Sequence, residues 1–284
     1  MPLKRFGRDN APVESGPEPP VRTNPTMTRA TVRDHLIVTY AVPPERVVPH
    51  LPEGLVPDRL PNVQGDLTAF VQVTCGLFQS ARWAPLPELA GDDFFQVTFR
   101  ILVRRAVAEP DRDRTENRGG VWVIRTLAST AERHLSRRLV DRSADFARIR
   151  LFVDGDPARG RYSLYQVRAE ADDGPTNLSI TFPEMPTESV PAPFGSLADM
   201  TGFLTERPEQ FFRMPIPGSA VGYLSLRQDP VTALQGELTA ARIAPLIEAK
   251  LLTGDEAAAP QSTLLIPSVT LQAYPPRPIR LRTA

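Results

Sequence analysis

The sequence predicts an α+β protein built mostly of antiparallel β-strands that curl into a closed cone or barrel, with a few short helices. Segments in which apolar and polar residues alternate with a period of two recur along the chain. Its 31 prolines are spread throughout and disfavour long helices. Strands do not alternate regularly with helices, as they would in a parallel sheet. Closure is expected because it removes unpaired sheet edges.

The composition is that of an ordinary globular protein, because 41% of the 284 residues are hydrophobic. Lys+Arg and Asp+Glu both number 33, so no overall field attracts nucleic acid or an anionic membrane, and neither is expected as a partner. Neither a secretory signal nor a run of about 20 apolar residues occurs. Cys75 is the single cysteine and cannot form an intramolecular disulfide. These features favour a cytoplasmic location.

The chain divides into two parts of different composition. Residues 1–28 are rich in Pro, Gly, Asn and charge without apolar periodicity, which predicts a disordered tail. Residues 29–284 are expected to form a single domain.

Strands dominate the first half of this domain. His35 to Tyr40 is β-branched and aromatic, and Pro43-Pro44 ends that strand and begins a short helix to about Val48. Leu67 to Phe78 and, most clearly, Phe94 to Arg104 alternate in polarity. Gly120 to Leu127 is predicted to pair with the latter as a long hairpin, with a charged loop at Ala106 to Arg118 between them.

The second half continues with short elements. The Ser-x-x-Glu spacing from Ser129 to Glu132 predicts a capped helix to about Asp141. Three strands are then expected to form an antiparallel meander, at residues 146–153, 161–169 and 177–182. After a proline-rich link, the remaining predicted elements are a helix at 197–204, strands at 210–213 and 220–227, a helix at 238–252 broken at Pro245, and a closing strand at 263–274.

Four segments in this order resemble a known family. They are Val42-Pro43-Pro44-Glu45 with Leu51-Pro52-Glu53-Gly54-Leu55, Phe99-Arg100-Ile101-Leu102-Val103, Gly120-Val121-Trp122-Val123, and Phe203-Leu204-Thr205-Glu206-Arg207. From about Asp34 to its end, the chain resembles the YqjF-like family of unknown function, within the acetoacetate decarboxylase-like superfamily. This resemblance implies a twisted antiparallel sheet closed into a cone, whose interior holds the ligand site in the decarboxylase.

The resemblance also shows where the chain departs from the enzyme. In the decarboxylase, a Gly-x-Pro-Lys-Lys segment supplies the lysine that forms a Schiff base, whereas the matching stretch here, Leu139 to Asp145, has no lysine. Arginine cannot replace it, because it stays protonated and is a poor nucleophile. The only lysines are Lys4, in the predicted tail, and Lys250, in a predicted exposed helix. A lysine Schiff-base decarboxylase is therefore not expected.

Four charged residues are the candidates for a ligand site. Arg100 lies on the polar face of its strand, and Arg125 is expected to share a face with Val121 and Val123. Either arginine, if buried, needs a carboxylate partner or an anionic ligand. Glu206 and Arg207 follow an apolar helix end, and Glu206 is a candidate partner for either arginine. A structural ion-pair network remains the competing interpretation.

No motif specifies a cofactor or a metal. The sequence has no P-loop, no Gly-x-Ser-x-Gly and no dinucleotide-binding glycine pattern. The histidines His35, His50 and His134 do not show ligand spacing, and Cys75 lies on an apolar strand face, as an inert core thiol would. We therefore expect neither a cofactor nor a metal.

Three functions remain open. The first is a small-molecule-binding domain for a small carboxylate or carbonyl compound, without Schiff-base chemistry. The second is a lyase or hydratase that acts on a keto acid by acid/base catalysis, with Glu206 as the acid or base. The third is a scaffold or homo-oligomer without a ligand. Both small-molecule hypotheses expect Arg100, Arg125 and Glu206 to converge on one cavity.

Overall fold

The computed structural model describes most of the predicted domain. The described residues are 28–82, 93–106, 119–130, 141–184, 190–215 and 221–281. The predicted tail lies outside them except for residue 28, which begins the first strand. Almost all of the predicted charged loop and residues 131–140 of the predicted helix also lie outside them.

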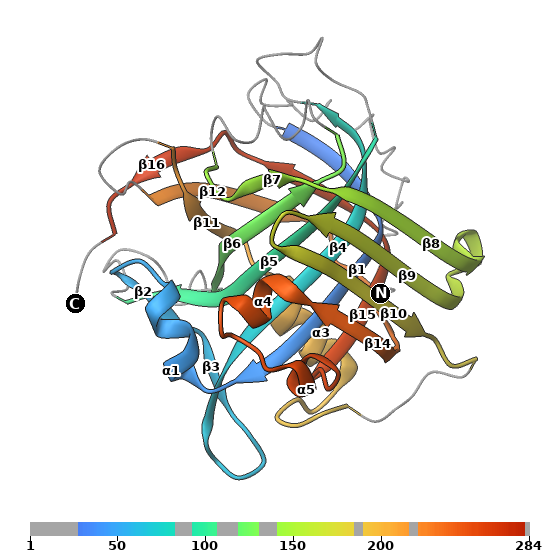
Figure 1. Ribbon diagram of the computed structural model, residues 1–284, viewed down its shortest axis with the longest axis horizontal. Coiled ribbons are helices and arrows are strands. Elements are labelled where there is room, and N and C mark those ends of the chain that lie inside the picture. The colour runs from blue at the N-terminus through green and yellow to red at the C-terminus, as the bar shows by residue number, and fades with distance from the viewer. Residues whose placement is uncertain are drawn as a thin grey trace, which may run out of the picture.

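A ring of strands forms the centre of the structure (Figure 1). Seven strands among the described residues pair in the order β15-β1-β4-β5-β6-β11-β12, and β12 pairs back with β15 to close the ring. All of these pairings are antiparallel except that of β6 with β11. The strands are β1 (Thr28–Val42), β4 (Leu67–Arg82), β5 (Phe94–Arg105), β6 (Gly120–Ala128), β11 (Glu209–Arg213), β12 (Val221–Gln228) and β15 (Ser262–Ala273). The predicted closed cone is confirmed.

Short strands extend the ring at its edges. They are β2 (Leu55–Pro57), β3 (Arg59–Pro61), β7 (Ala144–Phe146), β13 (Leu234–Gln235) and β16 (Arg277–Ile279).

A second sheet of four strands covers the outer face of the ring (Figure 1). Its order is β14-β10-β9-β8, with β8 (Arg148–Asp156), β9 (Arg161–Ala171), β10 (Gly174–Thr181) and β14 (Glu237–Ile243). The first three form the expected antiparallel meander. Two short helices, α4 (Ala244–Glu248) and α5 (Gly254–Ala257), lie beside this sheet.

The two faces of the ring pack against different partners. The outer face contributes Val73 and Phe99 to one apolar cluster, which includes Tyr165 of β9. The inner face contributes Phe70 and Leu102, among others, to a second cluster, in which they meet α3 (Leu197–Thr205). Burial on both faces explains why the central strands are rich in large apolar residues.

Helices are short, as the prolines predict. The Pro43-Pro44 pair ends β1 and begins α1 (Pro44–Val47), which a short 3-10 turn continues. The expected helix at 238–252 is wrong in its first half, because Glu237–Ile243 forms β14 and pairs with β10. Pro245 lies in the first turn of α4, where the N–H that proline lacks has no helical partner. No helix in the described ranges is long and apolar enough to span a membrane.

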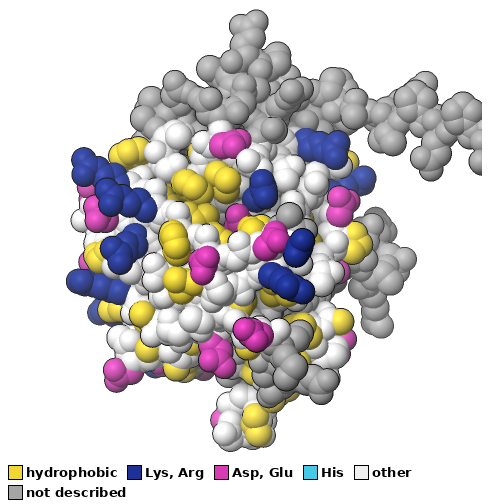
Figure 2. Space-filling view, turned by 90° about the vertical axis from the view of Figure 1, so that its right-hand side faces the viewer, with side chains coloured by type: hydrophobic (Ala, Val, Ile, Leu, Met, Phe, Trp, Pro, Cys, Tyr) yellow, Lys and Arg dark blue, Asp and Glu magenta, His cyan; other side chains and the backbone are white. Residues whose placement is uncertain are grey.

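Cys75 lies where the sequence predicts it, and Lys250 only in part. Lys250 is exposed as expected, but it follows α4 instead of lying in a helix, with a positive φ of 58°. Cys75 is buried in the outer cluster, and burial raises the pKa of its thiol. On the face of the molecule in Figure 2, the coloured basic and acidic side chains are interspersed, in keeping with the zero net charge.

The packing between the ring and the second sheet predicts a large effect of truncating Phe99, which is 0% exposed. We expect Phe99→Ala to lower the free energy of unfolding by about 3–5 kcal/mol, because it leaves a cavity. Phe152, which is 55% exposed on β8, provides the matched control. Phe152→Ala should change stability by about 0.5 kcal/mol or less in urea unfolding. Equal effects of the two variants would contradict this packing.

Candidate functional site

Arg100 lies on the inner face of the ring. Residues directly opposite in antiparallel strands share a face, and Arg100 stands opposite Gln72 of β4 and Val123 of β6. Its side chain is partly buried. The Nε–H of Arg100 donates a hydrogen bond of 2.8 Å to Oε1 of Gln72.

Gln72 connects Arg100 to the rest of the inner face. Its Nε2 donates to Oγ1 of Thr39 and to the carbonyl of Leu204, both at 3.2 Å. Gln72 and Thr39 are 0% exposed, and Leu204 belongs to the last turn of α3. The amide of Gln72 thus uses its oxygen for Arg100 and its nitrogen for Thr39 and α3, which fixes its orientation and that of the guanidinium.

The charge of Arg100 is not compensated within the described part of the chain. No carboxylate there forms an ion pair with it, and its only hydrogen bond goes to the neutral Gln72. Burial, followed by the charge of Arg207, lowers the pKa of Arg100 to about 10. Arg100 therefore stays protonated at neutral pH, and an anionic ligand is a suitable partner for it.

Arg207 lies near Arg100 but has an acid partner. Its side chain is 4% exposed, and its Nη1 donates to Oδ2 of Asp58 at 2.5 Å. Its guanidinium carbon lies 4.3 Å from the centre of the Phe203 ring. Burial lowers the pKa of Arg207, while Asp58 opposes this shift. Its Nε and Nη2 are buried and have no hydrogen-bond partner among the described residues.

Arg125 does not join this group, because it lies on the other face of the ring. The pairing of β5 with β6 shifts register, so that Arg125 stands opposite Phe99 while Val123 stands opposite Arg100. The expectation that Arg125 shares a face with Val121 and Val123 is therefore wrong. Its acid partners are Asp145, at 3.0 Å, and Asp173. Arg125 thus fits the structural ion-pair interpretation.

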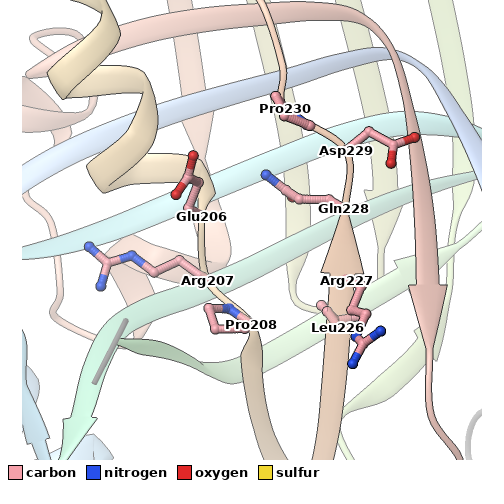
Figure 3. Close-up of a pocket in the computed structure, with 8 residues that line it drawn as sticks. All are labelled: Glu206, Arg207, Pro208, Leu226, Arg227, Gln228, Asp229 and Pro230. Carbon is pink, nitrogen blue, oxygen red and sulfur yellow. The ribbon is translucent and has the colours of Figure 1, made fainter. Parts of the chain in front are cut away.

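Glu206 lies at a pocket of about 310 Å³ at the end of α3. The pocket is lined by Glu206, Arg207, Pro208, Leu226, Arg227, Gln228, Asp229 and Pro230. Figure 3 shows the Gln228 amide pointing toward the exposed Glu206 across the gap, while the Arg207 guanidinium points away from Gln228. Nε2 of Gln228 is buried without a hydrogen-bond partner in the described ranges. Neither Arg100 nor Arg125 has Glu206 as its partner.

The geometry brings together Arg100 and Arg207, places Glu206 beside Arg207, and separates Arg125 from all three. The expectation that Arg100, Arg125 and Glu206 converge on one cavity is therefore wrong, because of the three only Glu206 lines the pocket at the end of α3. The candidate site residues chosen from the sequence were all charged and did not include Gln72, although strand alternation had placed it on the polar face of residues 67–78. They also did not include His35, whose pKa is lowered by burial and then by the charge of Arg100. Among the described residues, no three His, Cys, Asp or Glu side chains are arranged to hold a metal ion.

A known family model matches most of the chain. The model of the DUF2071 family, described as an uncharacterized conserved protein, matches residues 29–270. No functionally curated protein is significantly similar in sequence.

Solved structures match along nearly the whole chain. An acetoacetate decarboxylase-like enzyme from Sphingomonas wittichii RW1 is 14% identical with a TM-score of 0.58, covering 91% of this chain and 95% of its own. Acetoacetate decarboxylase from Legionella pneumophila is 12% identical with the same TM-score, covering 99% and 92%. The enduracididine biosynthesis enzyme MppR, solved with pyruvate, is 14% identical with a TM-score of 0.52, covering 90% of both chains. The chain therefore has the acetoacetate decarboxylase-like fold.

The environment of His35 predicts how stability depends on pH. Burial, followed by the charge of Arg100, lowers the pKa of His35 from 6.5 to about 3 in the folded protein. The unfolded chain therefore binds one more proton between these values, and the folded state loses about 1.4 kcal/mol of stability per pH unit as pH falls from 6.5 toward 3.

Urea unfolding at several pH values checks this prediction. His35→Gln should flatten the dependence of the unfolding free energy on pH below 6.5, since glutamine does not titrate. His50→Gln serves as the control and should retain the part of this pH dependence that comes from His35. An unchanged slope in His35→Gln would show that His35 is not held neutral in the folded protein.

Proposed function

Because the chain belongs to the DUF2071 family and has the acetoacetate decarboxylase-like fold, we propose that its closed sheet binds a small carboxylate or carbonyl compound without Schiff-base chemistry. One observation carries this proposal. The Arg100 guanidinium is held in place by Gln72 on the inner face of the ring and lacks a carboxylate partner among the described residues.

A carboxylate ligand supplies what Arg100 lacks. Its Nε is occupied by Gln72, so the terminal nitrogens are the groups that meet a ligand. Hydrogen bonds between a guanidinium and a carboxylate are charge-assisted and stronger than neutral ones. Arg207 adds positive potential nearby. A small anion is favoured over a large one, since α3 packs on the same face.

The described residues favour binding over imine chemistry. Residues 141–145, which correspond to part of the lysine segment of the decarboxylase, contain no lysine. Lys250 is exposed and follows α4 beside the second sheet, not the inner face. The MppR complex with pyruvate supports a small keto acid as a ligand class for this fold.

Acid/base catalysis is the alternative that the pocket at α3 favours. Glu206 supplies a carboxylate at that pocket. Arg207 lines the same pocket, and its charge acts on Arg100. A keto acid held by the arginines would then meet Glu206 as a general acid or base. Turnover of a bound keto acid, detected by NMR of the reaction mixture and lost in Glu206→Gln, would favour acid/base catalysis over ligand binding alone.

Replacing Arg100 by methionine tests whether this arginine binds a ligand or only stabilises the fold. We expect Arg100→Met to lose no more than about 1–3 kcal/mol of stability without ligand, because it leaves Oε1 of the buried Gln72 without its donor but also removes a partly buried charge that has no counter-ion among the described residues. Pyruvate at one hundred times its dissociation constant should stabilise the wild type by about 2.7 kcal/mol and leave this variant unchanged. Thermal unfolding with and without pyruvate measures both effects.

Arg125→Met is the matched control for this experiment. It should destabilise the protein, since Asp145 and Asp173 lose their partner, yet retain the response to pyruvate. A loss of about 3–5 kcal/mol in Arg100→Met without ligand would instead mark Arg100 as half of a buried ion pair.

The protonation of Arg100 predicts the pH dependence of binding. The carboxylate binds the protonated guanidinium, and the pKa of Arg100 is about 10. Affinity should therefore be constant from pH 7 to 9 and fall by up to about tenfold per pH unit above 10. Isothermal titration calorimetry measures it, with circular dichroism as the check on folding. Constant affinity to pH 11 in folded protein would exclude Arg100 as the binding cation.

A further inference from the structure

The second sheet ends at β8, a strand of nine residues at its edge (Figure 1). One side of β8 pairs with β9, and no strand among the described residues pairs with the other side. The N–H and C=O groups along such an edge are a template for a further strand. The opposite edge of the sheet, β14, lies next to the short helix α5. Within the described part of the chain, β8 is therefore the edge that a partner strand could extend.

The two faces of β8 carry different side chains. Ile149, Leu151 and Val153 are partly buried and pack on the outer apolar cluster of the ring. The alternate residues point away from the ring. They are four charged residues around one phenylalanine, namely Arg148, Arg150, Phe152, Asp154 and Asp156. All of these are exposed except Asp156, which is partly buried, and Phe152 at the centre of the row is 55% exposed.

The charges on this outward face change sign at Phe152. Both charged residues before it are arginines, and both after it are aspartates. A second copy of β8 that runs antiparallel around a two-fold axis at Phe152 brings Arg148 opposite Asp156 and Arg150 opposite Asp154. Phe152 then stands opposite itself. Side chains directly opposite in antiparallel strands are close enough to interact, so pairs of opposite charge flank an aromatic pair on both sides.

The central charges of this row have no ionic partner within the described residues. Arg150 forms no ion pair there, and its directly opposite neighbour on β9 is Arg168, which is also exposed. Like charges in such a pair are unfavourable. Asp154 accepts a hydrogen bond of 2.7 Å from Oγ of Ser163 but forms no ion pair in the described ranges. A facing copy of the strand supplies the opposite charge to both residues.

We propose that β8 is a homodimer interface, in which two copies pair antiparallel across a two-fold axis at Phe152 and join their second sheets into one continuous sheet. The partner is a second copy of this chain, because the charge pattern of β8 is complementary to itself. Charged residues on edge strands usually keep strands apart. That effect requires like charges to meet, whereas the antiparallel pairing brings arginine to aspartate. The interface lies outside the ring and is separate from the ligand site on the inner face.

The size of this contact predicts a reversible dimer. One pair of strands buries a small area, in the range of weak and transient interfaces. We therefore expect monomer and dimer to exchange at micromolar concentrations. Because Phe152→Ala is the stability control for Phe99→Ala, that comparison is made below the dissociation constant, where the chain is monomeric.

A charge swap across the axis tests the pairing, with sedimentation velocity at several concentrations as the measurement. Arg150→Asp should raise the dissociation constant at least about tenfold, because it places carboxylates opposite each other on both sides of the axis. Asp154→Arg should have a similar effect. The double variant R150D/D154R should return to within about threefold of the wild type. Arg150→Asp should keep its fold, because it puts an acid opposite Arg168.

Arg242→Asp is the matched control for the charge swap. Arg242 is exposed on β14, at the opposite edge of the same sheet, and the substitution changes the net charge by the same amount. It should leave the dissociation constant unchanged. A wild-type chain that stays monomeric at several hundred micromolar would overturn the proposal. So would equal weakening by Arg242→Asp, a dimer that Arg150→Asp leaves intact, or a double variant as weak as the single ones.

Cysteine cross-linking locates the two-fold axis. Phe152→Cys places a thiol opposite its symmetry mate at a Cα separation of about 4.5–5.5 Å, which a disulfide spans. Gln166, directly opposite Phe152 on β9, is three strand spacings from its mate, or about 14 Å. Mild oxidation should therefore link Phe152→Cys and not Gln166→Cys, while the native Cys75 is buried. Equal linking of both variants, or none in Phe152→Cys, would contradict the pairing.

Discussion

The hydrogen bond from Arg100 to Gln72 is the interaction on which the candidate site depends. It fixes a positive charge on the inner face of a closed sheet, where the side chain is partly buried and a counter-ion is absent from the described residues. Gln72 can do this because its other end is held by Thr39 and by the end of α3. One amide side chain thus connects β1, β5 and the end of α3 and fixes the orientation of the guanidinium.

The two faces of the ring differ in the groups that they carry. The outer face carries the larger apolar cluster, the second sheet and the ion pairs of Arg125 with Asp145 and Asp173. Buried polar atoms without a partner among the described residues occur on both faces. They include Nδ1 of His35 and two nitrogens of Arg207 on the inner face, and Nε of Arg125 on the outer face. The Tyr162 and Tyr165 hydroxyls of β9 donate to Asp34, beside His35. Unpaired buried polar groups lower stability unless a ligand satisfies them.

The sequence predicted the features that depend on local periodicity. Alternation along residues 67–78 and 94–104 placed Gln72 and Arg100 on polar strand faces, and the proline pair at 43–44 marked the end of β1. The closed sheet followed from many short strands and from the family resemblance. The segment at 238–252 was misassigned because β14 forms through pairing with β10, a long-range contact that a local pattern does not report.

Two register shifts explain why the site itself was predicted only in part. A shift of one residue exchanges every side chain between the faces of a strand. One shift, in the pairing of β5 with β6, moves Arg125 to the outer face, and the other, at Asp34, breaks the alternation between Val32 and Leu36. The first has no glycine or proline at its position. The second is marked only by Gly76 on the facing strand, and the tyrosines that hold Asp34 lie more than a hundred residues away in sequence.

A crystal structure of the chain with pyruvate shows whether Arg100 binds a ligand carboxylate inside the closed sheet. We expect density for a carboxylate about 3 Å from the terminal nitrogens of Arg100, with Nε still bonded to Gln72. Pyruvate bound elsewhere, or Arg100 paired with a carboxylate of the protein itself, would contradict it.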